Sequence, residues 1–191
     1  MKQAFKIIYI FITFSFLIYL LLPLSNFPDR QDGSLQSSEP ADIETQLRRG
    51  YYANSDRESV INYYQNEFGK TRLFGRELNL FSIRLNYPPE ESQTLIRDQN
   101  RSTYLEEIVH PFRQSLFISG FEPKYDKDRI VVDGTNYQQK LVIKLVVSNV
   151  FTRVLIGMLS MVLLYFNIKM WVNLMANLKK PSLTGVSKVT N

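Results

Sequence analysis

Long apolar runs lie near both ends of the chain, and a region of mixed apolar and polar positions separates them. The first run, from Ile7 to Leu24, reads IIYIFITFSFLIYLLLPL and holds 18 positions without a charge. The second, from Val154 to Val172, reads VLIGMLSMVLLYFNIKMWV, and its one charge is Lys169. At about 1.5 Å of rise per residue, each run comes close to the roughly 30 Å of a bilayer's hydrocarbon core. We therefore predict two transmembrane helices.

The first run has the features of a retained signal-anchor rather than those of a cleaved signal peptide. Its apolar stretch is long, and the sequence that follows, from Pro23 to Pro28, offers no A-x-A-like cleavage site. We therefore expect this span to remain part of the protein.

Helical spacing of apolar residues marks one clear helix between the spans, over residues 56–68. Ser55 and Glu58 stand at its start in the pattern of a capping box, in which each side chain bonds the other's backbone N–H. A second helix is predicted to begin at Pro88 and to run to about His110, because a proline fits the first turn and Pro111 would end the helix.

Strand patterns fill most of the remaining region. Apolar alternation or β-rich composition predicts strands near residues 51–52, over 78–87 with a possible bulge, over 115–119, and over 129–132 and 137–147. Asp133-Gly134 joins the last two as a hairpin turn, because a type I′ turn needs positive φ. The predicted fold class is α+β, with about two helices on an antiparallel or mixed sheet between two transmembrane helices.

These patterns divide the chain into five parts. We predict a transmembrane signal-anchor at 1–25, a flexible linker at 26–49, an α+β domain at 50–152, a second transmembrane helix at 153–174 and a short basic tail at 175–191. The linker prediction rests on a segment that is rich in Ser, Gly, Pro and Asp and poor in large apolar residues.

Charge is distributed unevenly, and the distribution predicts an orientation. All 18 acidic residues lie between Asp29 and Asp133, whereas both flanks carry only basic charge. The positive-inside rule therefore places both termini in the cytoplasm and residues 26–152 across the membrane. The residues expected at the membrane interfaces are Lys2, Lys6, Arg153, Lys169, Trp171, Lys179 and Lys180.

The formal net charge of +5 is not a nucleic-acid signal, because the excess comes from the short flanks. We expect the flanks to meet membrane lipid instead. The chain has no cysteine, which excludes disulfides, thiolate metal sites and cysteine nucleophiles. Since extracytoplasmic animal domains often carry disulfides, this absence favours a bacterial or organellar membrane, and of the two we expect the bacterial plasma membrane.

Three residues are the only candidates for catalysis: Glu106, Glu107 and His110. On the predicted helix, Glu107 and His110 stand at i and i+3, as in the Glu-x-x-His of di-metal sites. Such sites need two of these motifs, and His110 is the only histidine. No nucleophile elbow or phosphate-binding loop is found. We therefore expect no metal or cofactor, and interpret His110 as a surface or capping residue.

Two further groups of residues have structural interpretations. The aromatic concentration of Tyr51, Tyr52, Tyr63, Tyr64 and Phe68 could stack on a glycan or a single-stranded nucleic acid, but core packing is favoured. In the second span, Gly157 and Ser160 form a small-residue spot for close helix approach, and Asn167 could bond a neighbouring helix.

The pattern favours a non-enzymatic membrane protein, an accessory or assembly subunit whose partner is another membrane protein or a second copy. An envelope enzyme acting on glycan or lipid through the three candidates is the alternative from another class. A sensor that moves the second span is a third. Polysaccharide chain-length regulators resemble this chain in layout alone, and no proline-rich segment leads into its second span.

Overall fold

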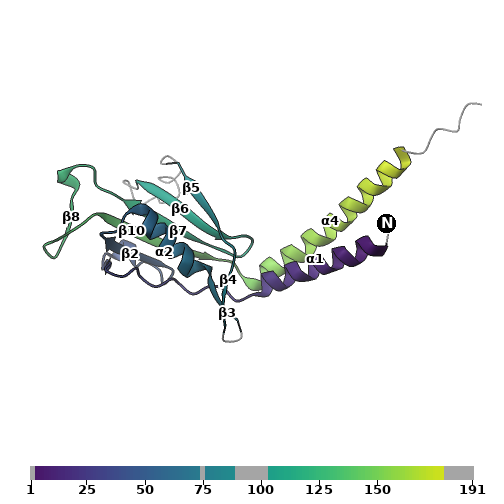
Figure 1. The fold of residues 1–191 in the computed structure, drawn as a ribbon, viewed down its shortest axis with the longest axis horizontal. Coiled ribbons are helices and arrows are strands. Elements are labelled where there is room, and N and C mark those ends of the chain that lie inside the picture. The colour runs from purple at the N-terminus through teal and green to yellow at the C-terminus, as the bar shows by residue number, and fades with distance from the viewer. Residues whose placement is uncertain (1–2, 74–75, 89–102, 179–191) are drawn as a thin grey trace, which may run out of the picture. The chain divides into compact units, whose positions relative to one another are not determined.

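The computed structural model describes residues 3–73, 76–88 and 103–178 of the chain (Figure 1). Contacts divide the chain into two units. One holds residues 1–21 and 150–191, with helices α1 (Gln3–Leu21) and α4 (Val150–Leu178). The other, Leu22–Asn149, is the α+β domain.

The domain is built on a six-stranded sheet in which every neighbouring pair is antiparallel. Its order is β1 (Leu35–Gln36), β2 (Arg48–Ala53), β10 (Gln139–Val147), β7 (Gln114–Phe121), β6 (Tyr104–His110) and β5 (Ile83–Tyr87). Two small hairpins complete it, β3 (Lys70–Leu73) with β4 (Arg76–Asn79) and β8 (Ile130–Val132) with β9 (Thr135–Tyr137). Two 3-10 turns, η1 (Pro40–Asp42) and η2 (Asp126–Asp128), lie in the connections.

Helix α2 (Arg57–Gly69) lies across one face of this sheet (Figure 1). Its apolar residues recur every three or four positions, which places them on one side of the helix. Val60, Ile61, Tyr64 and Phe68 are fully buried and pack on the sheet side chains Ile108, Leu116, Ile118, Leu141 and Ile143. The helix predicted at 56–68 is confirmed. Tyr51, Tyr64 and Phe68 belong to the core, as the packing interpretation of the aromatics expected.

Only one helix packs on the sheet within the described residues, so the expectation of two is wrong in that detail. Residues 104–110, predicted as the end of the second helix, form strand β6. Glu106 and His110 are polar but occupy buried, inward-facing positions of this strand. The sequence therefore lacks the apolar alternation by which a strand is predicted. The rest of the predicted helix, residues 89–102, lies outside the described residues.

The capping box at the start of α2 does not form. Asp56 is the N-cap residue, and Ser59 Oγ donates to its carboxylate. Ser55 Oγ instead donates to Gln31 Oε1 at 2.8 Å, and Glu58 bonds Arg84. Hydrogen bonds to residues distant in sequence therefore replace the expected capping-box hydrogen bonds at the start of α2.

The strand and turn predictions are correct in part. Asp133 and Gly134 have φ of 47° and 77°, as a type I′ turn requires, and they join β8 to β9. Strand β10 is separate from this hairpin and lies inside the large sheet. The strand expected over 78–87 is two strands, β4 and β5, which belong to different sheets.

Residues 22–49, which include the predicted linker, are hydrogen-bonded to the domain. Strand β1 pairs with β2, and Ser25 Oγ donates to Phe68 O at 3.0 Å. Lys140 Nζ pairs with Asp42 Oδ2 at 2.9 Å and Glu39 Oε2 at 2.8 Å, which attaches η1 to β10. This segment thus contributes to the sheet edge.

Both helices of the other unit are long and apolar enough to cross a membrane. Gly157 of α4 packs against Leu20 and Phe16 of α1, where a Cβ would overlap the Leu20 side chain. Arg153 is buried, and its Nε donates to Leu20 O at 2.6 Å, which caps a carbonyl at the end of α1. Close approach therefore occurs at Gly157.

The other described residues that were expected to lie in the spans or at the membrane interfaces make no buried contact between α1 and α4. Ser160 and Asn167 are exposed in this unit, as are Lys6, Lys169 and Trp171. Lys2, Lys179 and Lys180 lie outside the described residues.

Gly120 of β7 is predicted to tolerate no side chain, because a Cβ there would overlap the buried ring of Tyr104. We expect Gly120→Ala to lower the free energy of unfolding by about 1–3 kcal/mol, the usual cost of overpacking a core. Gly69→Ala is the matched control, since its Cβ would meet only Leu80 O at 3.6 Å. Thermal unfolding followed by circular dichroism in mild detergent compares the two; equal midpoints would contradict the prediction.

Candidate functional site

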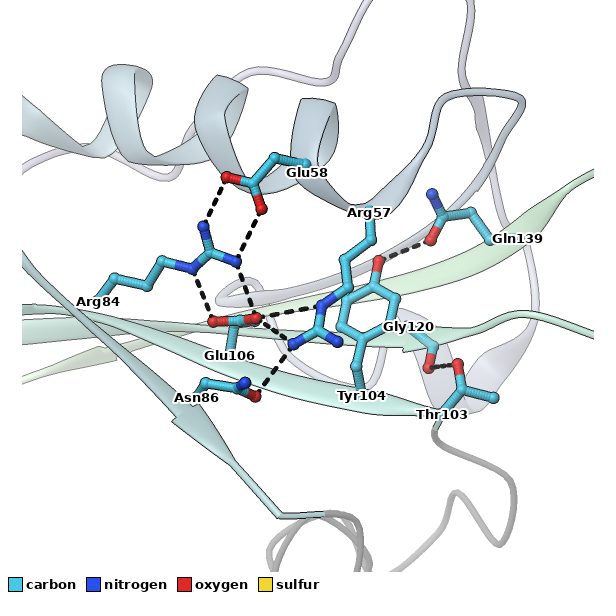
Figure 2. Close-up of polar contacts among 9 residues, drawn as sticks. All are labelled: Arg57, Glu58, Arg84, Asn86, Thr103, Tyr104, Glu106, Gly120 and Gln139. Atoms are coloured by element: carbon cyan, nitrogen blue, oxygen red, sulfur yellow. Dashed lines mark hydrogen bonds and ion pairs between the residues drawn. The ribbon is translucent and has the colours of Figure 1, made fainter.

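Within the described part of the domain, a group of charged side chains surrounds Glu106, whose own side chain is 0% exposed. Arg84 of β5 donates from Nε to Oε2 at 2.9 Å and from Nη2 to Oε1 at 3.1 Å. Arg57, the first residue of α2, donates from Nε to Oε1 at 3.2 Å (Figure 2). One carboxylate therefore joins a helix start and an edge strand to β6.

A second carboxylate completes the group, which we call the Glu106 cluster: Arg57, Glu58, Arg84 and Glu106. Glu58 accepts two bonds from Arg84, at 2.8 Å and 3.1 Å, in the bidentate geometry that arginine favours. Arg57 also donates to Asn86 Oδ1 at 3.0 Å (Figure 2). Two cations and two anions balance, so the cluster carries no net charge.

The protonation of Glu106 follows from these contacts. Burial is the largest influence and by itself would raise the pKa of this carboxyl, but the hydrogen bonds from Arg84 and Arg57 together outweigh it and lower the pKa. Glu106 is therefore ionised at neutral pH. A general acid needs a raised pKa, so this environment does not suit Glu106 to donate a proton.

Tyr104, the first residue of β6, lies next to the Glu106 cluster. The Arg57 guanidinium lies 4.7 Å from the centre of its ring, and its hydroxyl donates to Gln139 Oε1 at 2.6 Å (Figure 2). Burial raises the pKa of Tyr104, so the phenol stays neutral. Gly120 on the neighbouring strand leaves the space that the ring occupies.

His110 lies on the same face of β6 and is 0% exposed, contrary to the surface position expected from the sequence. Its Nδ1 is 3.0 Å from Phe81 O and its Nε2 is 2.9 Å from Phe68 O. Its ring stacks on that of Phe68, with centroids 4.5 Å apart. A neutral imidazole has one N–H and satisfies one of these carbonyls, whereas an imidazolium satisfies both. The histidine joins α2, β6 and the 80–82 connection.

Glu107 points to the opposite face of the sheet, because successive residues of a strand alternate. It accepts a hydrogen bond from Tyr87 of the neighbouring strand β5. The structure thus separates Glu107 from both Glu106 and His110. Four strand residues, or about 13 Å, separate Glu106 from His110 along their shared face. The three candidate residues are not brought together.

The sequence patterns did not identify Arg57 and Arg84 as part of this site. Arg84 alternates with the apolar residues Ile83 and Leu85, and such alternation predicts a solvated polar face rather than a buried ion pair. Among the residues that the structure describes, no three His, Asp or Glu side chains gather as a metal site would need. A polar cleft of about 560 Å³ lies beside α2, and the ion pair between Lys70 and Glu67 is in its lining.

Comparison of the chain with known protein families, curated proteins and solved structures finds no match. The fold itself defines a class: an α+β domain between two helices that are apolar enough to cross a membrane.

Neutralising the buried carboxylate should weaken the domain. We expect Glu106→Gln to lower the free energy of unfolding by about 3 kcal/mol, because two arginines lose their charged partner inside the fold. This loss lies at the lower end of the range measured when one partner of a buried ion pair is removed, because about a third of each arginine side chain is exposed to water. Glu107→Gln is the control and should change it by less than about 1 kcal/mol, because the amide still accepts from Tyr87.

The same pair of variants tests the pH dependence. A folded-state pKa below the ordinary 4.5 means that Glu106 contributes stability fully above pH 4.5 and loses it as pH falls through the lower folded value. Wild type and Glu107→Gln should therefore lose stability on acidification more steeply than Glu106→Gln. Denaturant unfolding at a series of pH values measures the slopes, and parallel slopes would refute this assignment.

Proposed function

We propose that this chain is a membrane protein whose α+β domain lies outside the cytoplasm and binds another membrane protein, as an accessory subunit rather than as an enzyme. The observation that carries the proposal is the exposed apolar edge strand β5. The location and orientation rest on the spans and on the charge distribution.

The membrane location is supported by α1 and α4, each long and apolar enough to span a bilayer. The orientation is supported by the partition of charge, in which every acidic residue falls between the two apolar runs. Lysines outnumber acids only in the flanks, which the positive-inside rule assigns to the cytoplasm.

The non-catalytic part of the proposal is supported by what the candidate residues do in the fold. Glu106 is bound by two arginines, Glu107 by Tyr87, and His110 by two backbone carbonyls. Glu106 and His110 are also fully buried, so a substrate could not reach either side chain without opening the domain. Each residue has a structural task that accounts for its position.

The binding surface is supported by strand β5. Within the described part of the chain, β5 is the last strand of its sheet and no other strand pairs with its outer side. Ile83 and Leu85 are 39% and 41% exposed and face away from α2. An edge strand with exposed apolar side chains suits strand addition by a partner, in which backbone bonds give affinity and side chains give specificity.

Site-specific photocrosslinking tests the binding surface. A photoreactive phenylalanine analogue at Leu85 should form a discrete crosslinked product in intact cells, because a paired strand would hold the partner against that side chain. Val131, which is apolar and exposed on β8, is the matched control and should give none. The absence of a product at Leu85, or the same products at both positions, would sink the proposal.

The orientation is tested through the absence of cysteine. Thr135→Cys places a thiol on the exposed β9 strand, and Val186→Cys places one near the C-terminus. A membrane-impermeant thiol reagent should label position 135 in intact cells, and position 186 only after the membrane is opened. Labelling of 186 but not of 135 in intact cells would reverse the orientation.

A further inference from the structure

The turn between β6 and β7 carries a bulky aromatic residue in an unusual conformation. Arg113 N donates to His110 O at 3.0 Å, which closes a four-residue turn with Pro111 second and Phe112 third. Phe112 has a φ of 62°, a position that glycine or asparagine normally fills in a turn of type II. Its side chain is 74% exposed. A strained conformation that presents an apolar ring to its surroundings points to a functional role for that ring.

A second exposed ring lies at the same end of the sheet. Phe81 is 77% exposed, and its carbonyl is 3.0 Å from Nδ1 of His110, the first residue of the turn. Strand β10 ends there too, since Val147 pairs with Gln114. We call Phe81 and Phe112 the aromatic tip. It is formed by two segments far apart in the sequence, which His110 holds together.

The aromatic tip lies where the chain leaves the domain at both ends. Arg113 is buried, and its Nη2 donates to Leu22 O at 3.3 Å. Ser25 N donates to Gln114 Oε1 at 3.2 Å, and Ser148 Oγ donates to Arg113 O. Leu22 directly follows α1, and Asn149 directly precedes α4. These hydrogen bonds therefore hold the turn beside the two domain segments that continue covalently into the candidate spans.

The charge of this end suits a lipid surface. The segments that end at the tip, 78–83, 110–115 and 144–149, contain no acidic residue. Their charged residues are Arg113, which is buried, and Lys144, which is exposed on β10. An end of the domain with two exposed apolar rings and an exposed lysine matches the boundary between acyl chains and anionic headgroups.

We propose that Phe81 and Phe112 insert into the membrane interface and dock this end of the domain on the lipid surface. The proposal rests on the assignment of α1 and α4 as transmembrane helices, and it is independent of the partner proposed for β5. Phenylalanine rings at the level of the headgroups would bury apolar area that water otherwise covers. The lipid bilayer itself is thus the partner of the aromatic tip.

Tryptophan fluorescence in lipid nanodiscs tests the insertion. Trp171 is the only tryptophan, so Trp171→Phe gives a background in which a single reporter can be placed. Full-length Phe112→Trp and Phe81→Trp variants are reconstituted in phosphatidylcholine–phosphatidylglycerol discs with lipids brominated near the headgroup end of the acyl chain. Both reporters should emit at shorter wavelength than in water and lose emission to the bromine.

Tyr125→Trp is the matched control, because Tyr125 is exposed beyond the opposite end of β7, which is about 23 Å long. It should emit as in water and respond to aqueous iodide but not to bromine. Tip reporters that behave like this control would overturn the proposal. Reporters shielded from both quenchers would also overturn it, because a protein surface would then cover the tip. Unfolding midpoints equal to that of the background show that each variant is folded.

The outcome is separable from that of the proposed function. Crosslinking at Leu85 and labelling at position 135 report on the partner and the orientation whether or not the tip inserts. Conversely, bromine quenching in discs that contain only this chain needs no partner.

Discussion

The burial of one carboxylate in the sheet face constrains much of the domain. An ionised Glu106 without cations would be too costly inside a fold, so α2 must begin, and β5 must lie, where Arg57 and Arg84 reach it. The two arginines come from elements that the β3–β4 hairpin separates in the chain and that belong to different layers. Their shared carboxylate therefore fixes the helix start against the sheet, while Val60, Ile61, Tyr64 and Phe68 supply the apolar contact along the rest of α2.

Much of the fold follows from the sequence where the periodicity is undisturbed. The helix over 56–68 and the Asp133-Gly134 turn were correctly predicted, because local spacing and turn chemistry decide them. Strand β6 was missed because Glu106 and His110 are buried polar residues, whose partners come from segments remote in sequence. The same reason applies to the capping box, because Glu58 is hydrogen-bonded to Arg84. Arg84 is remote in sequence, so a local capping rule could not predict this contact.

Candidate residues chosen from the sequence need not lie together in the fold, and this site is an example. Glu106, Glu107 and His110 were the right residues to examine, yet strand geometry separates them on two faces and over about 13 Å. Arg57 and Arg84 were not expected, since a charged residue at a helix start or on an edge strand is ordinarily solvated. Only the burial of Glu106 gives them a role, and burial depends on the tertiary arrangement.

The connections of the domain to the two long apolar helices differ in how they would carry mechanical load. Strand β10 lies inside the sheet, with β2 on one side and β7 on the other, and continues within three residues into α4. A pull along that strand must shear both ladders together. Leu22 and Ser25 are held through a few separate bonds, to Arg113, Gln114 and Phe68, which can yield one after another. Tension applied through the two apolar helices would therefore release the first connection before the second, leaving the sheet intact.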